Sequence, residues 1–218
     1  SRGLGDVYKR QFTKGNRYIY GVGNFFINLV DDNNKAVLPL VMLDSNMYGD
    51  GGWFYSGFDC IHKDQTEWCM NKLTSLKNED ENIKAMAFFH MPVREFKEAY
   101  ERMKLGDNDV IYKHGSVGEK NDHFGISRFK GIFFNSAVDN GVIKWMFCGH
   151  DHLNTLSLVY KGIQLTYGMS IDYLGYKGIE KQYTQRGGTL ITRKKDGSVS
   201  VKMVPLTSVV STKVSGVK

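Results

Sequence analysis

The stretch Val142-Ile-Lys-Trp-Met-Phe-Cys-Gly-His-Asp-His152 decides how the rest of the sequence is interpreted. Its first part is rich in apolar and β-branched side chains, which predicts a strand over residues 142–148. Gly149 permits a sharp turn that a β-carbon would obstruct. The sequence therefore predicts two imidazoles, His150 and His152, at the carboxyl end of a strand, which is where sites form in open α/β sheets.

A second apolar run, Ala85-Met-Ala-Phe-Phe89, predicts another buried strand, and His90 follows it directly. Neutral imidazole is the commonest metal ligand in proteins, and strand ends hold such ligands rigidly. A shared metal site is one interpretation of these histidines, although His90 by itself is equally compatible with a structural role. We expect the remaining histidines to be ordinary surface or core residues; these are His62, His114 and His123.

The rest of the chain reads as mixed α and β structure. Apolar spacing predicts helices over residues 64–76, 95–104 and 129–137, the first of them capped by Asp64. Antiparallel hairpins are predicted for residues 18–43, 156–167 and 189–204, and long loops for residues 46–59 and 105–127. Strand–helix–strand segments in the middle and hairpins at the ends predict the α/β class.

Composition excludes several classes of protein. The chain has 218 residues, enough for one domain or a small pair, and its 41% hydrophobic content argues against disorder as the main state. No apolar run approaches the ~18 residues that a membrane span requires. Three cysteines without C-x-x-C spacing indicate neither a disulfide framework nor a zinc ribbon.

Charge and termini give weaker indications. Residues 181–218 contain eight Lys/Arg and one Asp, so the net charge of +6 arises from this C-terminal part. A solvated tail is the simpler interpretation, and an anionic partner is the alternative; there is no strong nucleic-acid signal. We expect residues 1–16 to be a non-native or disordered lead, residues 17–206 to form the domain and residues 207–218 to fray. No signal peptide is visible, so the compartment is unknown, as is the oligomeric state.

The Phe-Phe-His-Met-Pro stretch at 88–92, followed by Phe147-Cys-Gly-His-Asp-His152, resembles the calcineurin-like metallophosphoesterases, particularly their purple-acid-phosphatase-like branch. Leu43-Asp-Ser45, Asp64-Gln-Thr-Glu-Trp68 and Tyr167-Gly168 are also similar to segments of that family. The resemblance covers about residues 17–205.

This resemblance implies a β-sandwich flanked by helices, with two metal ions at strand ends. His90 and His150 would bind one ion and His152 the other, and the ions would be Fe, Mn or Zn, which suit imidazole and carboxylate ligands. The implied activity is metal-dependent hydrolysis of phosphoesters by a dinuclear site. The implied substrate is a phosphorylated small molecule or a phosphoprotein.

The chain departs from the family pattern in its earlier part. The D-x-H, G-D and G-N-H-D/E motifs supply the remaining ligands and the histidine that assists the leaving group. The first and last are missing, and the Gly-Asp pairs at 5–6, 49–50 and 106–107 do not follow suitable strands. We therefore expect the C-terminal half of such an enzyme, inactive on its own. The alternatives are a non-catalytic binding module of the same fold with a basic C-terminal surface, and a mononuclear site made by three histidines.

Overall fold

The computed structural model describes residues 15–50, 56–175, 179 and 186–209. Most of the expected lead and tail, and residues 51–55 of the first predicted loop, lie outside the described residues. Where the lead is described, Gly15 forms an isolated parallel bridge with Asn24. At the other end, Leu206–Ser208 form a short 3-10 helix.

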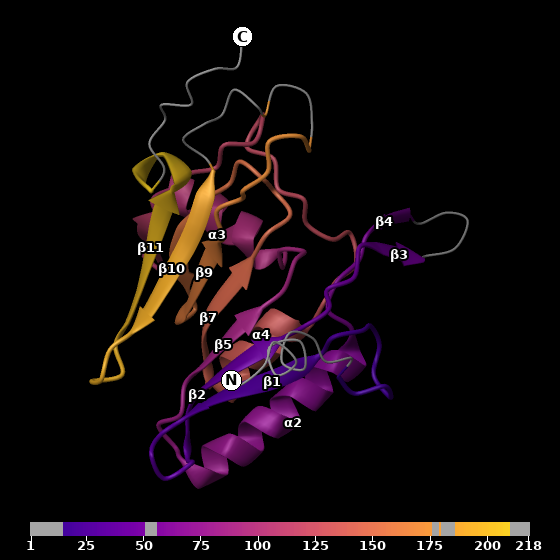
Figure 1. The fold of residues 1–218 in the computed structure, drawn as a ribbon. Coiled ribbons are helices and arrows are strands. Elements are labelled where there is room, and N and C mark those ends of the chain that lie inside the picture. The colour runs from indigo at the N-terminus through magenta and orange to yellow at the C-terminus, as the bar shows by residue number, and fades with distance from the viewer. Residues whose placement is uncertain (1–14, 51–55, 176–178, 180–185, 210–218) are drawn as a thin grey trace, which may run out of the picture.

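The centre of the molecule is a mixed seven-stranded sheet with the strand order β1-β2-β5-β7-β9-β8-β6 (Figure 1). The inner strands β2, β5, β7 and β9 run parallel, and the edge pairs β1–β2, β8–β9 and β6–β8 are antiparallel. The strand bounds are Phe25–Val30 for β1, Ala36–Met42 for β2, Ala85–Phe88 for β5, Val110–His114 for β6, Ile143–Cys148 for β7, Ser157–Tyr160 for β8 and Ile163–Tyr167 for β9.

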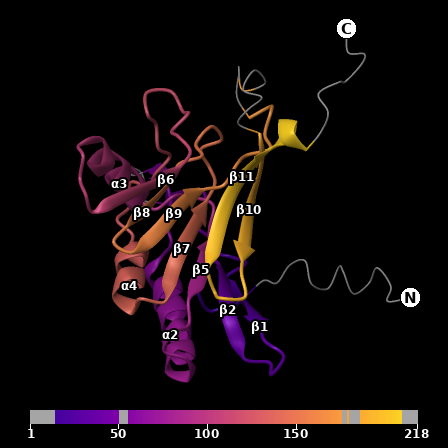
Figure 2. The ribbon, with the colours of Figure 1, turned by 90° about the vertical axis from the view of Figure 1, so that its left-hand side faces the viewer.

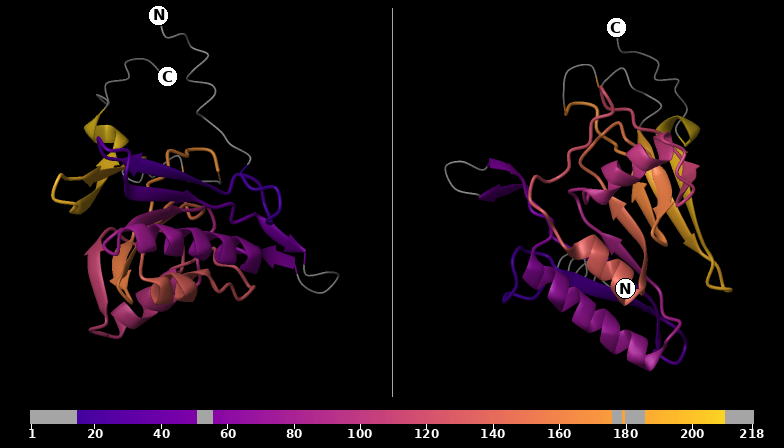
Figure 3. Two further views of the ribbon diagram at one scale, coloured as in Figure 1. Left: turned by 90° about the horizontal axis from the view of Figure 1, so that it is seen from below. Right: turned by 180° about the vertical axis from the view of Figure 1, so that it is seen from behind.

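Helices cover one face of this sheet. They are α2 (Lys63–Glu79), α3 (Glu95–Lys104) and α4 (Phe133–Asn140). Side chains alternate along a strand, so Ala85 and Ala87 of β5 share the helix-covered face and join its core. These small residues pack in one cluster with the buried Leu73 of α2 and Phe134 of α4. Figure 3 shows α2 and α4 together below the sheet.

A two-stranded hairpin covers part of the opposite face. It consists of β10 (Gly187–Arg193) and β11 (Val199–Pro205), paired in antiparallel register. Its Ile191 packs against the small core formed by Leu38, Met86 and Phe147 of the central sheet. Figure 2 shows this hairpin beside β5 and above β2. The α/β class is therefore confirmed, with sheet packed on sheet on one side and helices on the other.

Most predicted elements are present with shifted ends. The helix 95–104 has the predicted bounds, and α4 is capped by Gly141, whose φ of 78° lies in the left-handed region. The predicted hairpin 156–167 is present, with Lys161 and Gly162 as the turn between β8 and β9. None of the described helices has the length and apolar character needed to cross a bilayer.

Three expectations about individual elements were wrong. The polar segment 105–127 contains strand β6, and the loop 46–59 contains a small hairpin of β3 (Tyr48–Asp50) and β4 (Ser56–Phe58). Helix α2 begins after His62 instead of at an Asp64 cap. The Asp64 carboxylate instead accepts a hydrogen bond from the Tyr20 amide at 2.6 Å. It therefore anchors the distant segment before β1.

Candidate functional site

The main chain brings the turns after β5 and β7 together. Phe88 and Phe147 are partners in the parallel register, and the amide of Phe89 donates to the Phe147 carbonyl at 3.1 Å. One step further, the Gly149 amide donates to the carbonyl of His90 at 3.0 Å. The ring centroids of His90 and His150 consequently lie 5.4 Å apart, with their planes at 86°. Two of the predicted ligands are therefore neighbours.

His150 occupies an unusual backbone conformation. Its φ is 70°, in the left-handed region that a residue with a β-carbon adopts at an energetic cost. The edge of its ring meets Phe58 of β4 at 4.4 Å between centroids. Gly125 lies so close behind the ring that a β-carbon there would be 2.1 Å from His150 Cδ2. The turn is thus held in place by packing on both sides of the imidazole.

Ser45, which follows β2, fixes the backbone at His90. Its hydroxyl accepts hydrogen bonds from the amides of His90 at 3.1 Å and Met91 at 2.7 Å, and its side chain is buried. Three neighbouring strand ends therefore contribute to this edge of the sheet. The sequence showed the strand end at Leu43-Asp-Ser45, but it gave no signal that Ser45 would support His90.

Asp151, between the two histidines, faces the protein interior. The carboxylate is 6% exposed, and both of its oxygens accept from the Gly125 amide at 3.0 Å. The Tyr167 hydroxyl donates to the same carboxylate at 2.7 Å. Burial of Tyr167 raises the pKa of its phenol well above the ordinary value. Asp151 is therefore a structural residue that anchors the turn.

His152 is held by a second aspartate that the sequence did not indicate. Its Nδ1 lies 2.6 Å from Asp172 Oδ2. The amides of Leu174 and Gly175 also donate to this carboxylate, and these backbone hydrogen bonds and that from His152 lower the pKa of Asp172. A neutral His152 with its Nδ1–H bound to Asp172 carries its lone pair on Nε2. In metal sites, a carboxylate that accepts a hydrogen bond from the other ring nitrogen of a histidine orients that histidine toward the ion.

The surroundings of His90 and His150 favour their neutral imidazoles. Burial is the main cause that lowers the pKa of His90 and of His150, and repulsion from the neighbouring histidines acts in the same direction. Asp151 opposes the shift in both residues. Because metal ligation requires the unprotonated ring, this environment suits ligands better than isolated surface histidines.

The donor set nevertheless does not fit a complete metal site. Within the described ranges there is no group of three or more His, Cys, Asp or Glu side chains that could hold an ion. The two aspartates beside the histidines are both engaged: Asp151 binds Gly125 and Tyr167, and Asp172 binds His152 and two amides. This part of the chain also does not support the mononuclear three-histidine alternative.

The other histidines lie in different environments. His62 Nε2 contacts both oxygens of the buried Asp59 at 2.9 and 3.0 Å, and its ring stacks on Tyr20 at 3.8 Å. In the described structure, both ring nitrogens of His114 are buried and have no hydrogen-bond partner, and burial lowers its pKa. His123 is exposed.

Comparison with known proteins gives a consistent result. Over 73% of its own length, the chain is 29% identical to "Probable inactive purple acid phosphatase 29" of Arabidopsis thaliana. Two further proteins of the same plant are similar to it. The chain is 24% identical to "Probable inactive purple acid phosphatase 28" over 75% of its own length, and 23% identical to "Probable inactive purple acid phosphatase 14" over 65%. It spans 41%, 40% and 35% of these three relatives. No family model and no solved structure gives a match. The resemblance to the purple-acid-phosphatase-like branch of the calcineurin-like metallophosphoesterases, predicted from the histidine motifs, is thereby confirmed.

Proposed function

We propose that this chain supplies the imidazole side of a phosphoester-hydrolysing metal site in a larger protein. His90 and His150 would serve one ion and His152 a second, and the remaining ligands would come from outside the described residues. The observation that carries this proposal is the 5.4 Å approach of the His90 and His150 rings at hydrogen-bonded strand ends. The substrates of the whole protein would be phosphorylated small molecules or phosphoproteins, and the ions Fe, Mn or Zn.

The chain alone should lack phosphatase activity. The carboxylates beside the histidines are engaged in hydrogen bonds that hold the turn and His152, so they are not available to complete a dinuclear site. Charge stabilisation by two ions is the main chemical contribution in such sites. Half of the ligand set cannot hold such a pair of ions.

Zn²⁺ titration of the 218-residue chain by calorimetry tests the proposal. We expect weak binding, micromolar or poorer, which corresponds to about 8 kcal/mol or less. His90→Ala and His150→Ala should each weaken it further. His62→Gln is the matched control, because His62 belongs to a separate pair with Asp59 and glutamine retains a hydrogen-bond donor. Equal binding by all variants would contradict the ligand assignment.

A phosphatase assay with an aryl phosphate and Zn²⁺ or Mn²⁺ tests the half-site interpretation. We expect no metal-dependent turnover by the chain alone. Turnover that His150→Ala abolishes would contradict the proposal, since it would show that the present residues complete the site.

The names of the relatives, each called a probable inactive phosphatase, favour a second candidate. In that case the chain would be a non-catalytic binding module that retains the fold and presents the exposed basic residues of β10–β11 to an anionic partner. The two experiments above separate the candidates. Absence of both turnover and a histidine-dependent Zn²⁺ response would favour the binding module.

A further inference from the structure

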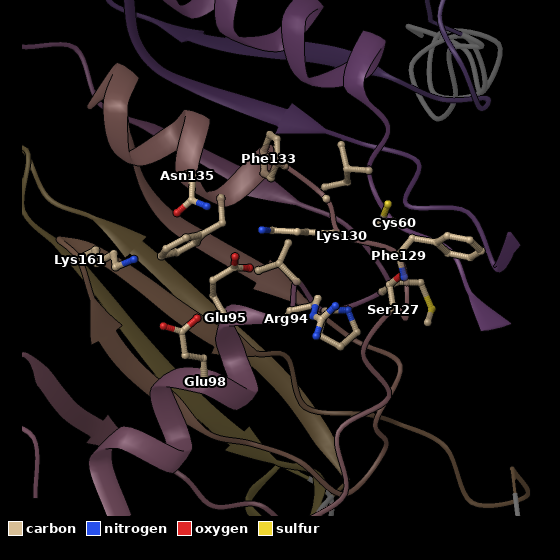
Figure 4. A pocket seen from close by; sticks show the side chains of 16 residues that line it. Cys60, Arg94, Glu95, Glu98, Ser127, Phe129, Lys130, Phe133, Asn135 and Lys161 are labelled. Carbon is tan, nitrogen blue, oxygen red and sulfur yellow. The ribbon is translucent and has the colours of Figure 1, made fainter. Parts of the chain in front are cut away.

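A cavity of about 380 Å³ lies beside the turn that follows His90. Its walls come from residues 91–98, which lead into α3, from residues 127–135, which lead into α4, and from the β8–β9 turn at Lys161. Figure 4 shows the labelled side chains converging from these separate elements. The volume lies within the range of ~300–1,000 Å³ that is typical of small-molecule sites.

Charged groups of both signs surround this cavity. Glu95 and Glu98 project from the first turns of α3, whereas Lys130 projects from the segment before α4. In Figure 4, the Lys130 side chain extends into the opening toward the region of Glu95. No ion pair joins Glu95 to Lys130 or to any other described residue. Arg94 and Lys161 also line the cavity near the two glutamates, so charges of both signs face the opening.

Glu95 is the half-buried carboxylate of the cavity lining. Burial raises the pKa of its side chain despite the nearby Lys161 and Arg94. Glu98 differs, because its carboxylate accepts a hydrogen bond from the Tyr160 hydroxyl. A partly desolvated carboxylate is stabilised by a cation placed beside it. The position next to Glu95 is consequently suited to a ligand ammonium group.

Aromatic residues form the apolar part of the lining. The lining includes the half-buried Phe129 and the buried Phe133 and Phe134. Phe133 also packs edge-on against Phe89, so this wall is continuous with the core and rigid. Aromatic rings bind other rings in offset or edge-to-face arrangements. The wall thus favours a flat apolar group beside the charged side chains.

We propose that this cavity binds a small aromatic zwitterion. Its ammonium group would contact Glu95, its carboxylate would contact Lys130, and its ring would lie against Phe129. The proposal does not depend on the metal-site proposal, because it uses none of the three histidines.

Three probes that share a phenyl ring test this assignment. Each probe is titrated into the full chain, and binding is followed by NMR. Phenylalanine carries both charges, phenethylamine only the ammonium and 3-phenylpropionate only the carboxylate. We expect phenylalanine to bind about tenfold more tightly than either other probe, the size expected for one charged hydrogen bond. Glu95→Gln and Lys130→Met should each remove this advantage. Lys130 is exposed, so its variant is expected to fold normally.

Glu101→Gln is the matched control, since Glu101 lies on the same helix α3, is exposed and is not part of the cavity lining. It should leave phenylalanine binding unchanged. The proposal would be overturned by absent binding of phenylalanine at millimolar concentration, by equal binding of the three probes, or by equal losses in the control and in Glu95→Gln. Chemical-shift changes confined to surfaces away from Phe129 and Glu95 would also overturn it.

Discussion

The two sides of the turn at residues 149–152 differ in how completely their polar groups are satisfied. On the inner side, Asp151 is buried and bound by Gly125 and Tyr167. On the outer side, the His90 and His150 rings meet edge to face at 5.4 Å, and in the described structure no third ligand joins them in a group that could hold a metal ion. The inner side accounts for the shape of the turn, and the outer side carries the proposed ligands. Substitutions on the two sides should therefore affect different measurable properties.

The largest effect on stability is expected from Asp151→Ala. This change leaves the Gly125 amide and the Tyr167 hydroxyl buried without their acceptor, at a cost of about 3 kcal/mol in the free energy of unfolding. Urea unfolding followed by circular dichroism measures the loss. Asp139→Ala, which changes an exposed aspartate at the end of α4, should alter stability by about 0.5 kcal/mol or less. Similar values for the two variants would contradict the structural role of Asp151.

A smaller loss, about 2 kcal/mol, is expected from Gly125→Ala. The new β-carbon would lie 2.1 Å from His150 Cδ2 and 2.8 Å from Asp151 Oδ1, so the turn must move. The NMR signals of the His150 ring should shift at the same time. Gly188→Ala provides the control, because nothing lies within 4 Å of its added β-carbon. Unchanged His150 signals would show that the turn is not held by this contact.

The smallest effect concerns pH. Burial lowers the pKa of His90 and His150 in the folded chain. Below the unfolded pKa of about 6.5, the unfolded state therefore binds more protons than the folded state. The contribution of these two histidines to the free energy of unfolding is fully present above pH 6.5. It declines as the pH falls toward their lowered pKa values in the folded chain. Urea midpoints between pH 7 and pH 5 measure the decline. The double variant His90→Asn/His150→Asn should decline less steeply, and an equal slope would contradict the expectation.

The strand ends were predictable from the sequence because apolar runs followed by histidine have a simple pattern. Ala85–Phe88 and Ile143–Cys148 are strands, and His90 and His150 are neighbours as their positions suggested. The contacts that hold these histidines in place were not predictable. Asp172 reaches His152 from twenty residues away in the chain and Ser45 reaches His90 from forty-five, through contacts that no local pattern encodes.

Contacts between residues that are distant in the chain also explain the errors in predicted secondary structure. Strand β6 lies in a segment rich in glycine and charge, and it is a strand because β8 offers it an antiparallel partner. Asp64 has the sequence signature of a cap but bonds to Tyr20, a contact between residues forty-four apart. Local propensity is a weak prior wherever such tertiary partners exist.

The hydrogen bond from the Gly149 amide to the His90 carbonyl has a consequence for the evolutionary history of such proteins. This bond uses only main-chain atoms, so it does not itself require an imidazole at position 90 or 150. A lineage could therefore replace either histidine and retain this contact between the two strand ends. Such descendants would lack a proposed ligand but keep the hydrogen bond.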